Sequence, residues 1–480
     1  MTHHIAVDIG ASSGRLMLGS YLNTGKLILT QLHRFNNGFT HVDGHDHWGS
    51  EHLLTQILVG LEKAKQAGVT HCTLAIDTWA VDYVLLDTDG VKLREAIAYR
   101  DPRTQGKIDE LAKQLPKTEH YAKTGIQFLD FNTVYQLACE PRELLAATDT
   151  ILLMPDYLGY RLTGTAVTEH TNATTTALLN HQTGTWDDEL LTLAGVRAEQ
   201  FAPLVQPGHS LGTLLPKWSE QYDLPHCQLY TAATHDTASA VLAIPTTDMT
   251  STAYISSGTW SLLGVENPQA ITTDTALSAN YSNEGGAYGT YRLLKNIMGL
   301  WLIQQVRYNW LQDTGQDIDF ARLVELAEQE PANHILIDAN DPVFLNPLHM
   351  VTAIRGYTVE HAQPMPMTLG QLARCVFDSL ALSYKQALTE LEQITGRTFT
   401  TLHVIGGGSQ NALLNQLTAN ATGKTVIAGP VEATAIGNIL SQLIATGAIS
   451  DIAVGRALVK QSFLLETFFP QTQGAPHDTH

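Results

Sequence analysis

Two Gly/Ser turns, far apart in the chain, carry residue types that suit a phosphate group. The first lies between two apolar runs near the N-terminus and reads Asp8-Ile9-Gly10-Ala11-Ser12-Ser13-Gly14-Arg15. The second, Ser256-Ser257-Gly258-Thr259, also lies between apolar runs. A hairpin whose tip carries small residues exposes backbone N–H groups and hydroxyls in a concave turn, which is a phosphate-binding shape. The repeat predicts two related lobes that face one polyphosphate.

Charged residues flank the first turn. Asp8 ends the first predicted strand, and beside a triphosphate it would hold Mg²⁺ mainly through water, because Mg²⁺ keeps much of its hydration shell. Arg15 would add a fixed positive charge for a phosphate. The alternatives stay open: a lone Asp-x-Gly is usually an ordinary turn acid, and Arg15 could form a surface ion pair instead.

His235-Asp236-Thr237 follows an apolar strand that ends near Tyr230. In sugar phosphorylation the attacking hydroxyl must be oriented and must lose its proton, and a carboxylate is the commonest group for this task. Asp236 is therefore the candidate base. The run after it, 238–241, predicts a helix, so Asp236 and Thr237 could simply cap its N-terminus. His235, one of 20 histidines, is expected to position substrate or neighbouring groups.

Three further groups could contact a nucleotide or a sugar. Gly406-Gly407-Gly408 follows a predicted strand, and its spacing differs from the dinucleotide-binding fingerprint. Such a turn lets adenine or ribose lie against the backbone, or it is a packing turn. Asn296 and Gln304 are placed on one helix, where their separation puts them on roughly one face. Asn296 could reach sugar hydroxyls and Gln304 the nucleotide, unless both are surface amides.

Alternating strand and helix patterns position these residues and predict an α/β fold. A predicted strand over 72–76 delivers Asp77 and Trp79 at the edge where α/β folds usually keep their chemistry. A long helix is predicted from Thr368 to Gly396, followed by strands at 402–405 and 424–428.

The remaining stretches define the domains. Residues 127–180, rich in Thr, Tyr and Asn, are expected to form an irregular insert that shapes a sugar pocket. We place the domain boundary so that 1–244 forms the first domain and 245–480 the second. Residues 471–480 are expected to fray.

The composition of the chain argues against several classes of function. The 480 residues carry a formal net charge of −19, which argues against nucleic acid or an anionic membrane as the main partner. The four cysteines have no metal-ligand spacing and are expected to be buried or inert thiols. We see no signal peptide and no run of membrane-spanning length, and expect a cytoplasmic protein.

Together these motifs resemble the FGGY carbohydrate kinases of the actin-like ATPase superfamily, over nearly the whole chain from Ile5 to Thr446. The segments that carry the resemblance are Ala6-Val7-Asp8-Ile9-Gly10-Ala11-Ser12-Ser13-Gly14-Arg15, Ile76-Asp77-Thr78-Trp79, Leu153-Met154-Pro155-Asp156-Tyr157, Thr171-Asn172-Ala173-Thr174-Thr175-Thr176, His235-Asp236-Thr237-Ala238-Ser239-Ala240-Val241, Ser256-Ser257-Gly258-Thr259-Trp260-Ser261-Leu262, Asn283-Glu284-Gly285-Gly286, Leu294-Lys295-Asn296-Ile297-Met298-Gly299-Leu300-Trp301 and Gly406-Gly407-Gly408 with Asn411.

The resemblance implies two actin-like (ribonuclease H-like) α/β lobes, each with a mixed sheet flanked by helices, and an active-site cleft between them. It implies ATP and Mg²⁺ as cofactors, with Asp8 as the Mg²⁺ residue and Asp236 as the base. The implied ATP contacts are Ala11, Ser12, Ser13, Gly14, Arg15, Thr259, Gln304 and Gly407. The implied sugar contacts are Ala80, His235, Asp236, Thr237 and Asn296. The family usually has glycine where this chain has Ala80; a backbone contact would survive the methyl group, but a very tight approach would not.

The implied reaction is transfer of the ATP γ-phosphoryl group to O1 of L-rhamnulose. Two alternatives remain: a kinase of the same fold that acts on another ketose such as a pentulose, and a non-enzymatic, actin-like module switched by nucleotide. The second would not require His235-Asp236-Thr237 or a polar sugar insert. Oligomeric state does not follow from the sequence.

Overall fold

The computed structural model describes residues 2–471, which fold into two compact units interleaved along the chain. Unit 1 comprises the residues up to Thr247, Glu266–Leu293 and Ala433–Ser462. Unit 2 comprises Asp248–Val265, Leu294–Glu432 and the described residues from Phe463 onward. The predicted division at 244 and 245 remains a prediction about the folding domains, and most of the predicted frayed end, 472–480, lies outside the described residues.

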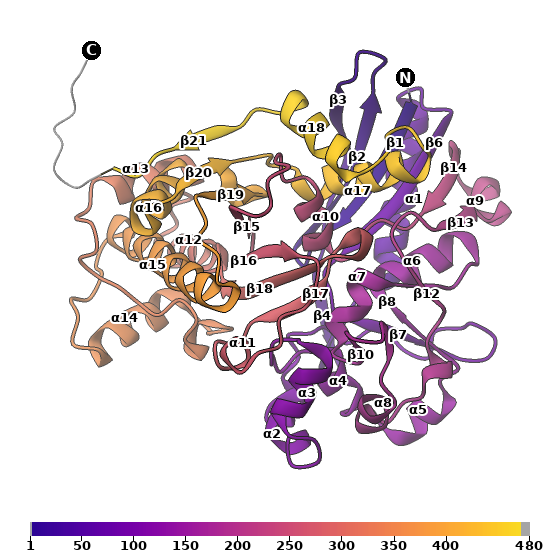
Figure 1. The fold of residues 1–480 in the computed structure, drawn as a ribbon, viewed down its shortest axis with the longest axis horizontal. Coiled ribbons are helices and arrows are strands. Elements are labelled where there is room, and N and C mark those ends of the chain that lie inside the picture. The colour runs from indigo at the N-terminus through magenta and orange to yellow at the C-terminus, as the bar shows by residue number, and fades with distance from the viewer. Residues whose placement is uncertain (1, 472–480) are drawn as a thin grey trace. The chain divides into compact units, whose positions relative to one another are not determined.

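Unit 1 is built on a six-stranded mixed sheet of order β13-β14-β6-β1-β2-β3 (Figure 1). The strands β1 and β2 form the first predicted hairpin, and β1 runs parallel to β6, which runs parallel to β14. The bounds are β1 Thr2–Ile9, β2 Ser13–Tyr21, β3 Leu27–Asn36, β6 His71–Thr78, β13 Ser210–Thr213 and β14 His226–Tyr230.

The two faces of this sheet bury different kinds of side chain, because successive residues of a strand point to opposite faces. Ile5, Val7 and Leu74 share an apolar core with helices α1 (Ser50–Gln66) and α6 (Met154–Thr163). Helix α17 (Ala433–Ala445) packs against the other face of β1 and β6. Its polar side chains bond to polar residues of β6: Gln442 accepts from Thr73, and Asn438 donates to Asp77. One face of the sheet is therefore a hydrophobic core, whereas the other carries a buried polar network that includes Asp77.

Unit 2 repeats the strand pattern of unit 1. In a seven-stranded sheet of order β17-β18-β16-β15-β19-β20-β21, the hairpin β15–β16 is antiparallel, and β15, β19 and β20 run parallel, as β1, β6 and β14 do. The chain passes between the units inside β16 and β18. The bounds are β15 Thr252–Ser257, β16 Trp260–Asn267, β17 Ser282–Gly285, β18 Tyr291–Met298, β19 Thr401–Ile405, β20 Thr425–Ala428 and β21 Glu466–Phe468. This repeat confirms the two related α/β lobes expected from the two Gly/Ser turns.

Short elements fill the rest of unit 1. Residues 127–180, predicted to be irregular, contain helices and short strands, so that prediction was wrong. Apart from the ten-residue α6, the α-helices of this segment have only four to six residues and are too short to show a period in the sequence. The strands are β4 Phe39–Val42, β5 His45–Trp48, β7 Tyr83–Leu86, β8 Thr150–Leu153, β9 Thr168–Glu169, β10 Leu179–Asn180, β11 Thr185–Trp186 and β12 Leu204–Val205. The helices are α2 Lys107–Leu111, α3 Lys117–Thr124, α4 Thr133–Leu137, α5 Arg142–Ala147, α7 His170–Ala173, α8 Asp188–Ala194, α9 Pro216–Gln221, α10 Asp236–Leu242, α11 Asp274–Ser278 and α18 Ile452–Ser462.

Helices of unit 2 pack around the long helix α15 (Leu369–Thr395), which confirms the prediction for this stretch. Thr368 and Gln371 form a capping box at its start, and Gly396 ends it with a φ of 65°. The other helices are α12 Trp301–Thr314, α13 Phe320–Glu328, α14 Met350–Glu360 and α16 Ala412–Thr422.

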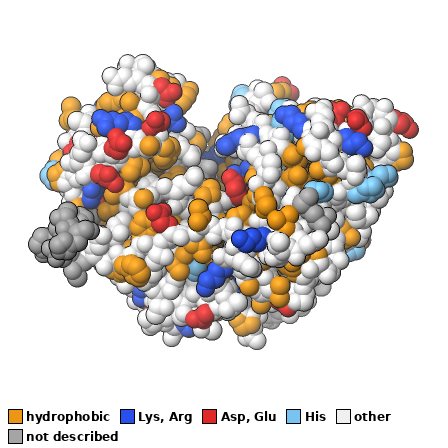
Figure 2. All heavy atoms as spheres, turned by 90° about the horizontal axis from the view of Figure 1, so that it is seen from above, with side chains coloured by type: hydrophobic (Ala, Val, Ile, Leu, Met, Phe, Trp, Pro, Cys, Tyr) orange, Lys and Arg blue, Asp and Glu red, His pale blue; other side chains and the backbone are white. Residues whose placement is uncertain are grey.

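The surface carries both signs of charge. On the face in Figure 2, basic and acidic side chains are interspersed, with no broad patch of one sign. Among the described residues, no helix is both long and apolar enough to cross a membrane. Cys72, Cys227 and Cys375 are buried free thiols and Cys139 is partly buried, as expected. Cys72 and Cys227 lie opposite each other on β6 and β14, with their sulfurs 3.4 Å apart.

Glycine at position 437 sets the distance between α10 and α17. A Cβ atom there would lie 1.7 Å from the backbone oxygen of Ser239 in α10. We predict that Gly437→Ala lowers the free energy of unfolding by about 1–3 kcal/mol, because the two backbones must separate. Denaturant unfolding measures this change.

Gly356→Ala is the matched control. Gly356 lies within α14 and has nothing within 4 Å of the Cβ position. This variant should raise stability by up to about 1 kcal/mol, because alanine favours the helix and meets no atom. Equal effects of the two substitutions would contradict the close-packing account.

Candidate active site

Parallel strands of unit 1 bring three predicted site residues to one edge of the sheet. Asp8 on β1 is paired in register with Asp77 on β6. At the next position, Thr78 forms a bridge to His235, and its N–H donates to the backbone oxygen of Thr234 at 2.9 Å. The carboxyl ends of parallel strands are the usual place for chemistry in α/β sheets. Asp8, Asp77 and the start of α10 therefore share this edge, as the strand patterns predicted.

The first Gly/Ser turn is closed by a backbone bond from Gly10 N–H to the oxygen of Ser13 at 2.9 Å. Gly14 is required by packing, because a Cβ there would lie 2.2 Å from the Phe35 ring. Arg15 donates to one oxygen of Asp8 from Nε at 3.0 Å and from Nη2 at 2.8 Å. Arg15 thus forms an ion pair, as the alternative interpretation of the sequence predicted. The pair lies beside the turn that is predicted to bind phosphate.

Asp236 has one occupied and one unoccupied carboxylate oxygen. Its Oδ1 accepts from the Thr237 N–H at 2.6 Å and from the Thr237 hydroxyl at 3.2 Å, and lies 3.4 Å from His235 Nε2. Within residues 2–471, no donor contacts Oδ2. The side chain is 32% exposed. The predicted cap is only partly correct, because His235 is the N-cap residue and Asp236 is the first residue of α10.

The protein around Asp236 shifts its proton equilibrium. Removal from water, and then the charge of Asp8, raise the pKa of Asp236, whereas His235 and the Thr237 donors lower it. Burial, reinforced by Asp8, raises the pKa of Asp77 well above its usual value, which favours the neutral form of this carboxyl. Asp8, in contrast, is held in an ion pair with Arg15.

These acids suit a hydrated Mg²⁺ ion better than a tightly coordinated one. Carboxylate oxygens are ligands that Mg²⁺ prefers, and an ion that keeps several waters needs only one or two of them. The buried Oδ1 of Asp77 has no hydrogen-bond partner. No group of three or more His, Cys, Asp and Glu among residues 2–471 is arranged to hold a metal. Asp8 therefore fits a magnesium ion that arrives with its own ligands, as ATP-bound Mg²⁺ does.

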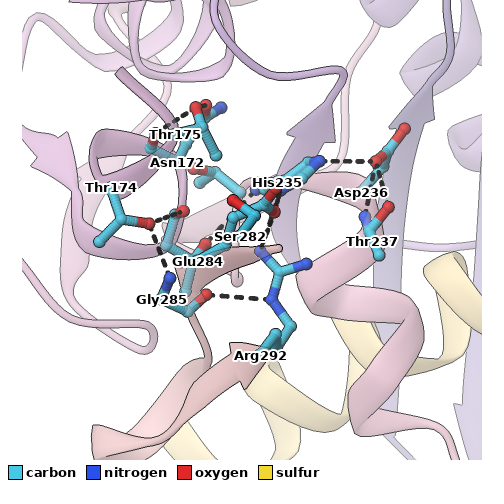
Figure 3. Close-up of polar contacts among 12 residues, drawn as sticks. Asn172, Thr174, Thr175, His235, Asp236, Thr237, Ser282, Glu284, Gly285 and Arg292 are labelled. Atoms are coloured by element: carbon cyan, nitrogen blue, oxygen red, sulfur yellow. Dashed lines mark hydrogen bonds and ion pairs between the residues drawn. The ribbon is translucent and has the colours of Figure 1, made fainter. Parts of the chain in front are cut away.

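A buried network holds His235 from the side opposite Asp236 (Figure 3). Its Nδ1 lies 3.2 Å from Glu284 Oε2 and 3.0 Å from Arg292 Nη2. Glu284 and Arg292 come from β17 and β18, neighbouring strands joined by a short turn. Glu169 holds the preceding residue, because its Oε2 accepts from the N–H of Thr234 at 3.0 Å and from its hydroxyl at 2.8 Å.

Ala80 lies in a constrained loop after β6. The next residue, Val81, has a φ of 69°, a conformation that β-branched residues rarely adopt. Asp82 fixes the loop: its Oδ2 accepts from the indole N–H groups of Trp48 at 2.6 Å and Trp79 at 2.9 Å. Burial raises the pKa of Asp82 to about 6, and these bonds oppose that shift. The backbone at Ala80 is thus held in one shape, as a substrate-binding loop requires.

The other predicted nucleotide residues lie in unit 2. Thr259 is at the tip of the β15–β16 hairpin, and its oxygen accepts from the Trp301 N–H at the start of α12 at 3.2 Å. Gln304 lies in the first turn of that helix. The glycine turn packs on the same hairpin, because a Cβ at Gly408 would lie 1.9 Å from Ser257 Oγ. Thr259, Gln304 and the turn that contains Gly407 therefore lie near one another in unit 2.

The predicted shared helix of Asn296 and Gln304 was wrong. Asn296 belongs to β18, which ends at Met298, and Gln304 belongs to α12, which begins at Trp301. Gly299 lies between them, and a Cβ there would lie 2.6 Å from the backbone of Trp260. The close approach of β16 thus interrupts an apolar run that resembles a helix in the sequence.

Glu284, Arg292, Glu169 and Asp82 were given no role from the sequence. Glu284 was noted only as part of Asn283-Glu284-Gly285-Gly286. A weak signal existed: a single glutamate is followed eight residues later by an arginine, across a glycine-rich turn. That spacing becomes informative only when the two strands are known to pair.

Comparison with known proteins identifies the family to which the chain is similar. The FGGY family of carbohydrate kinases matches the chain twice, its N-terminal domain over residues 3–243 and its C-terminal domain over 253–446. A rhamnulokinase of Bacillus subtilis (strain 168) is 53% identical over 468 residues, 98% of this chain and 95% of that protein. A rhamnulokinase of Lactiplantibacillus plantarum is 49% identical over 472 residues, 98% of this chain and 96% of that protein.

A solved structure shows the same fold. The crystal structure of gluconate kinase from Lactobacillus acidophilus aligns with a TM-score of 0.79 at 17% identity, over 98% of this chain and 94% of that one. The chain belongs to the FGGY family of carbohydrate kinases.

Proposed function

We propose that this protein transfers the γ-phosphoryl group of ATP to O1 of L-rhamnulose and releases L-rhamnulose 1-phosphate and ADP. The relatives that are 53% and 49% identical are rhamnulokinases, which supports this ketose over others. The observation that carries the reaction is the carboxylate of Asp236, with Oδ1 bound and Oδ2 without a donor among the described residues. We propose a cytoplasmic enzyme, because ATP is supplied there.

Asp236 acts as a proton acceptor for the sugar hydroxyl. Phosphoryl transfer needs little covalent help from protein, so orientation and charge neutralisation supply most of the rate. A sugar hydroxyl is far too weakly acidic to ionise beforehand, and its proton therefore moves late, as the bond to phosphorus forms. Oδ2 accepts that proton, while the donors of Thr237 hold Oδ1 and fix the direction of the carboxylate.

In this reaction, the predicted site residues of the two units would bind ATP as follows. Arg15 and the turn residues 11–14 bind phosphate oxygens, with Thr259, Gln304 and Gly407 as further contacts to the nucleotide. A phosphate that binds Arg15 would free Asp8 from its ion pair. Asp8 could then hold Mg²⁺, which neutralises phosphate charge.

The proposed sugar contacts come from several elements: the start of α10, strand β18 and the loop after β6. His235, Thr237 and Asn296 bind hydroxyl groups of the ketose, and the backbone at Ala80 contributes a further contact. The rigid conformation of the loop around Val81 supports this role, because a preformed loop loses little freedom when the sugar binds.

Asp236→Asn tests the proton acceptor. We expect kcat to fall on the order of 10²-fold or more, because the amide cannot take the proton, while the Kd for ATP changes little. Steady-state ADP release and a nucleotide-binding titration measure the two quantities. Asp223→Asn, at an exposed site in the same unit, is the control and should retain full turnover. Near-normal turnover of Asp236→Asn would remove Asp236 from this role.

A ketose panel tests the substrate. ADP release in the presence of L-rhamnulose, D-xylulose, L-xylulose or D-ribulose should give the highest kcat/KM with L-rhamnulose. A preference for a pentulose would replace the substrate but leave the kinase reaction. If no sugar raises ADP release above the basal rate, the nucleotide-switched module becomes the better account.

A further inference from the structure

Glu284 and Arg292 form a buried ion pair directly behind His235. Arg292 has no exposed side-chain surface, and only 8% of the Glu284 side chain is exposed. Arg292 Nη2 donates to Glu284 Oε2 at 2.9 Å, and its Nε donates to the backbone oxygen of Gly285 at 3.1 Å. Figure 3 shows both side chains converging on the ring of His235. The pair is thus locked to its own hairpin before it meets the histidine.

Stability alone does not explain this pair. Removing two charges from water costs several kcal/mol per ion, and well-packed neutral groups often serve a core equally well. Burial would raise the pKa of Glu284, but Arg292 and then His235 hold it below its usual value, so the carboxylate stays charged. Two full charges are therefore maintained beside one imidazole nitrogen.

His235 Nδ1 lies beside a donor, Arg292 Nη2, and an acceptor, Glu284 Oε2. These two neighbours decide whether the second ring nitrogen, Nε2, carries a proton. In one form, Nδ1 has no proton and accepts from Arg292 Nη2, so the proton of the neutral ring lies on Nε2. In the second form, Nδ1–H donates to Glu284 and the ring is an imidazolium, which also carries a proton on Nε2. The remaining neutral form would point the Nε2 lone pair at a carboxylate oxygen, which is repulsive.

Both favourable forms direct an Nε2 proton at Asp236. His235 Nε2 lies 3.4 Å from Asp236 Oδ1, the oxygen that also accepts the two Thr237 bonds. This third polar neighbour lies at ion-pair distance and helps to orient the carboxylate, while the two Thr237 donors occupy Oδ1. Oδ2 is then the oxygen left for an incoming hydroxyl.

We propose that Glu284 and Arg292 are positioning residues for phosphoryl transfer: together they hold the His235 ring with its Nε2–H directed at Oδ1 of Asp236, which leaves Oδ2 as the proton acceptor. This inference rests on the proposed kinase reaction and adds two residues that act through His235. It does not require Glu284 or Arg292 to touch the sugar.

The main test replaces both charges at once. The double variant with Glu284→Gln and Arg292→Met removes the pair without leaving an unpaired charge, so it should fold with stability close to that of the parent. We expect kcat for L-rhamnulose to fall on the order of 10-fold or more, because the orientation of His235 is lost. The KM for ATP should stay within about twofold, because within the described chain the side chains of Glu284 and Arg292 bond only to each other, to Gly285 and to His235, none of which is a proposed nucleotide contact.

A second buried pair in unit 1 supplies the matched control. Glu266 bonds Arg456, and each side chain is 8% exposed. Arg456 also donates to the backbone oxygen of Val241 in α10, but among residues 2–471 neither member of the pair contacts His235 or Asp236 directly. The double variant with Glu266→Gln and Arg456→Met should keep the parental kcat. An equal loss of kcat in both double variants would overturn the positioning role, because it would indicate a general effect of buried charge.

A double-mutant cycle with His235 distinguishes a positioning role of Glu284 and Arg292 from a purely structural one. In a His235→Gln background, loss of the Glu284 and Arg292 charges should lower kcat no further, because the residue they act through is gone. Full additivity would contradict the inference. Arg292→Lys, which keeps a buried charge, should retain more activity than the double variant.

Nitrogen-15 NMR of labelled histidine, assigned with His235→Gln, gives a readout that does not depend on whether the variants fold. In the parent protein, Nε2 of His235 should show the shift of a protonated ring nitrogen throughout the pH range of activity. A bare Nε2 would overturn the inference. Turnover by Asp236→Asn, in contrast, decides the proposed function: if that variant is inactive and Nε2 is bare, only the positioning role fails.

Discussion

A carboxylate that takes a proton from a sugar hydroxyl must remain charged in surroundings that favour its neutral form. The reaction needs water to be removed, and removal of water raises the pKa of an acid. At Asp236, partial burial and the charge of Asp8 act in this direction, whereas His235 and the donors of Thr237 oppose them. The contacts to one oxygen thus favour the charged form of the acid and fix its direction, and the other oxygen remains for chemistry.

Much of unit 1 can be understood as support for those contacts. The strands β1 and β6 place Asp8 and Asp77 at the same edge, and the bridge from Thr78 to His235 brings the start of α10 to it. Glu169 fixes Thr234 from a second direction. The close packing of α10 on α17, which Gly437 permits, holds the helix that begins with Asp236. Segments far apart in the sequence therefore fix a single carboxylate.

The parts of this arrangement that depend on local pattern could be predicted from the sequence. Both hairpins follow from small residues between apolar runs, and α15 follows from its helical period, its capping box and Gly396. The location of Asp77 and His235 follows from the rule that polar residues after buried strands gather at one sheet edge.

The parts that depend on tertiary contact could not be predicted. Asn296 lies in a run whose apolar spacing suits a helix, but strand β16 approaches so closely at Gly299 that the run divides into strand and helix. The partnership of Glu284, Arg292 and His235 requires knowledge of strand pairing and of burial, which local spacing does not give. The interleaving of the units has the same origin, because α17 packs on strands β1 and β6, which lie more than 350 residues earlier, as the bonds from Asn438 to Asp77 and from Gln442 to Ile5 show.

A crystal structure with L-rhamnulose and a non-hydrolysable ATP analogue tests the central claim most directly, because it shows which carboxylate oxygen meets the sugar. Our account predicts that Oδ2 of Asp236 lies about 2.6–3.2 Å from O1 of the ketose, with Oδ1 still bound to Thr237 and His235. A complex in which O1 contacts Oδ1, or in which neither oxygen of Asp236 reaches the sugar, would contradict it.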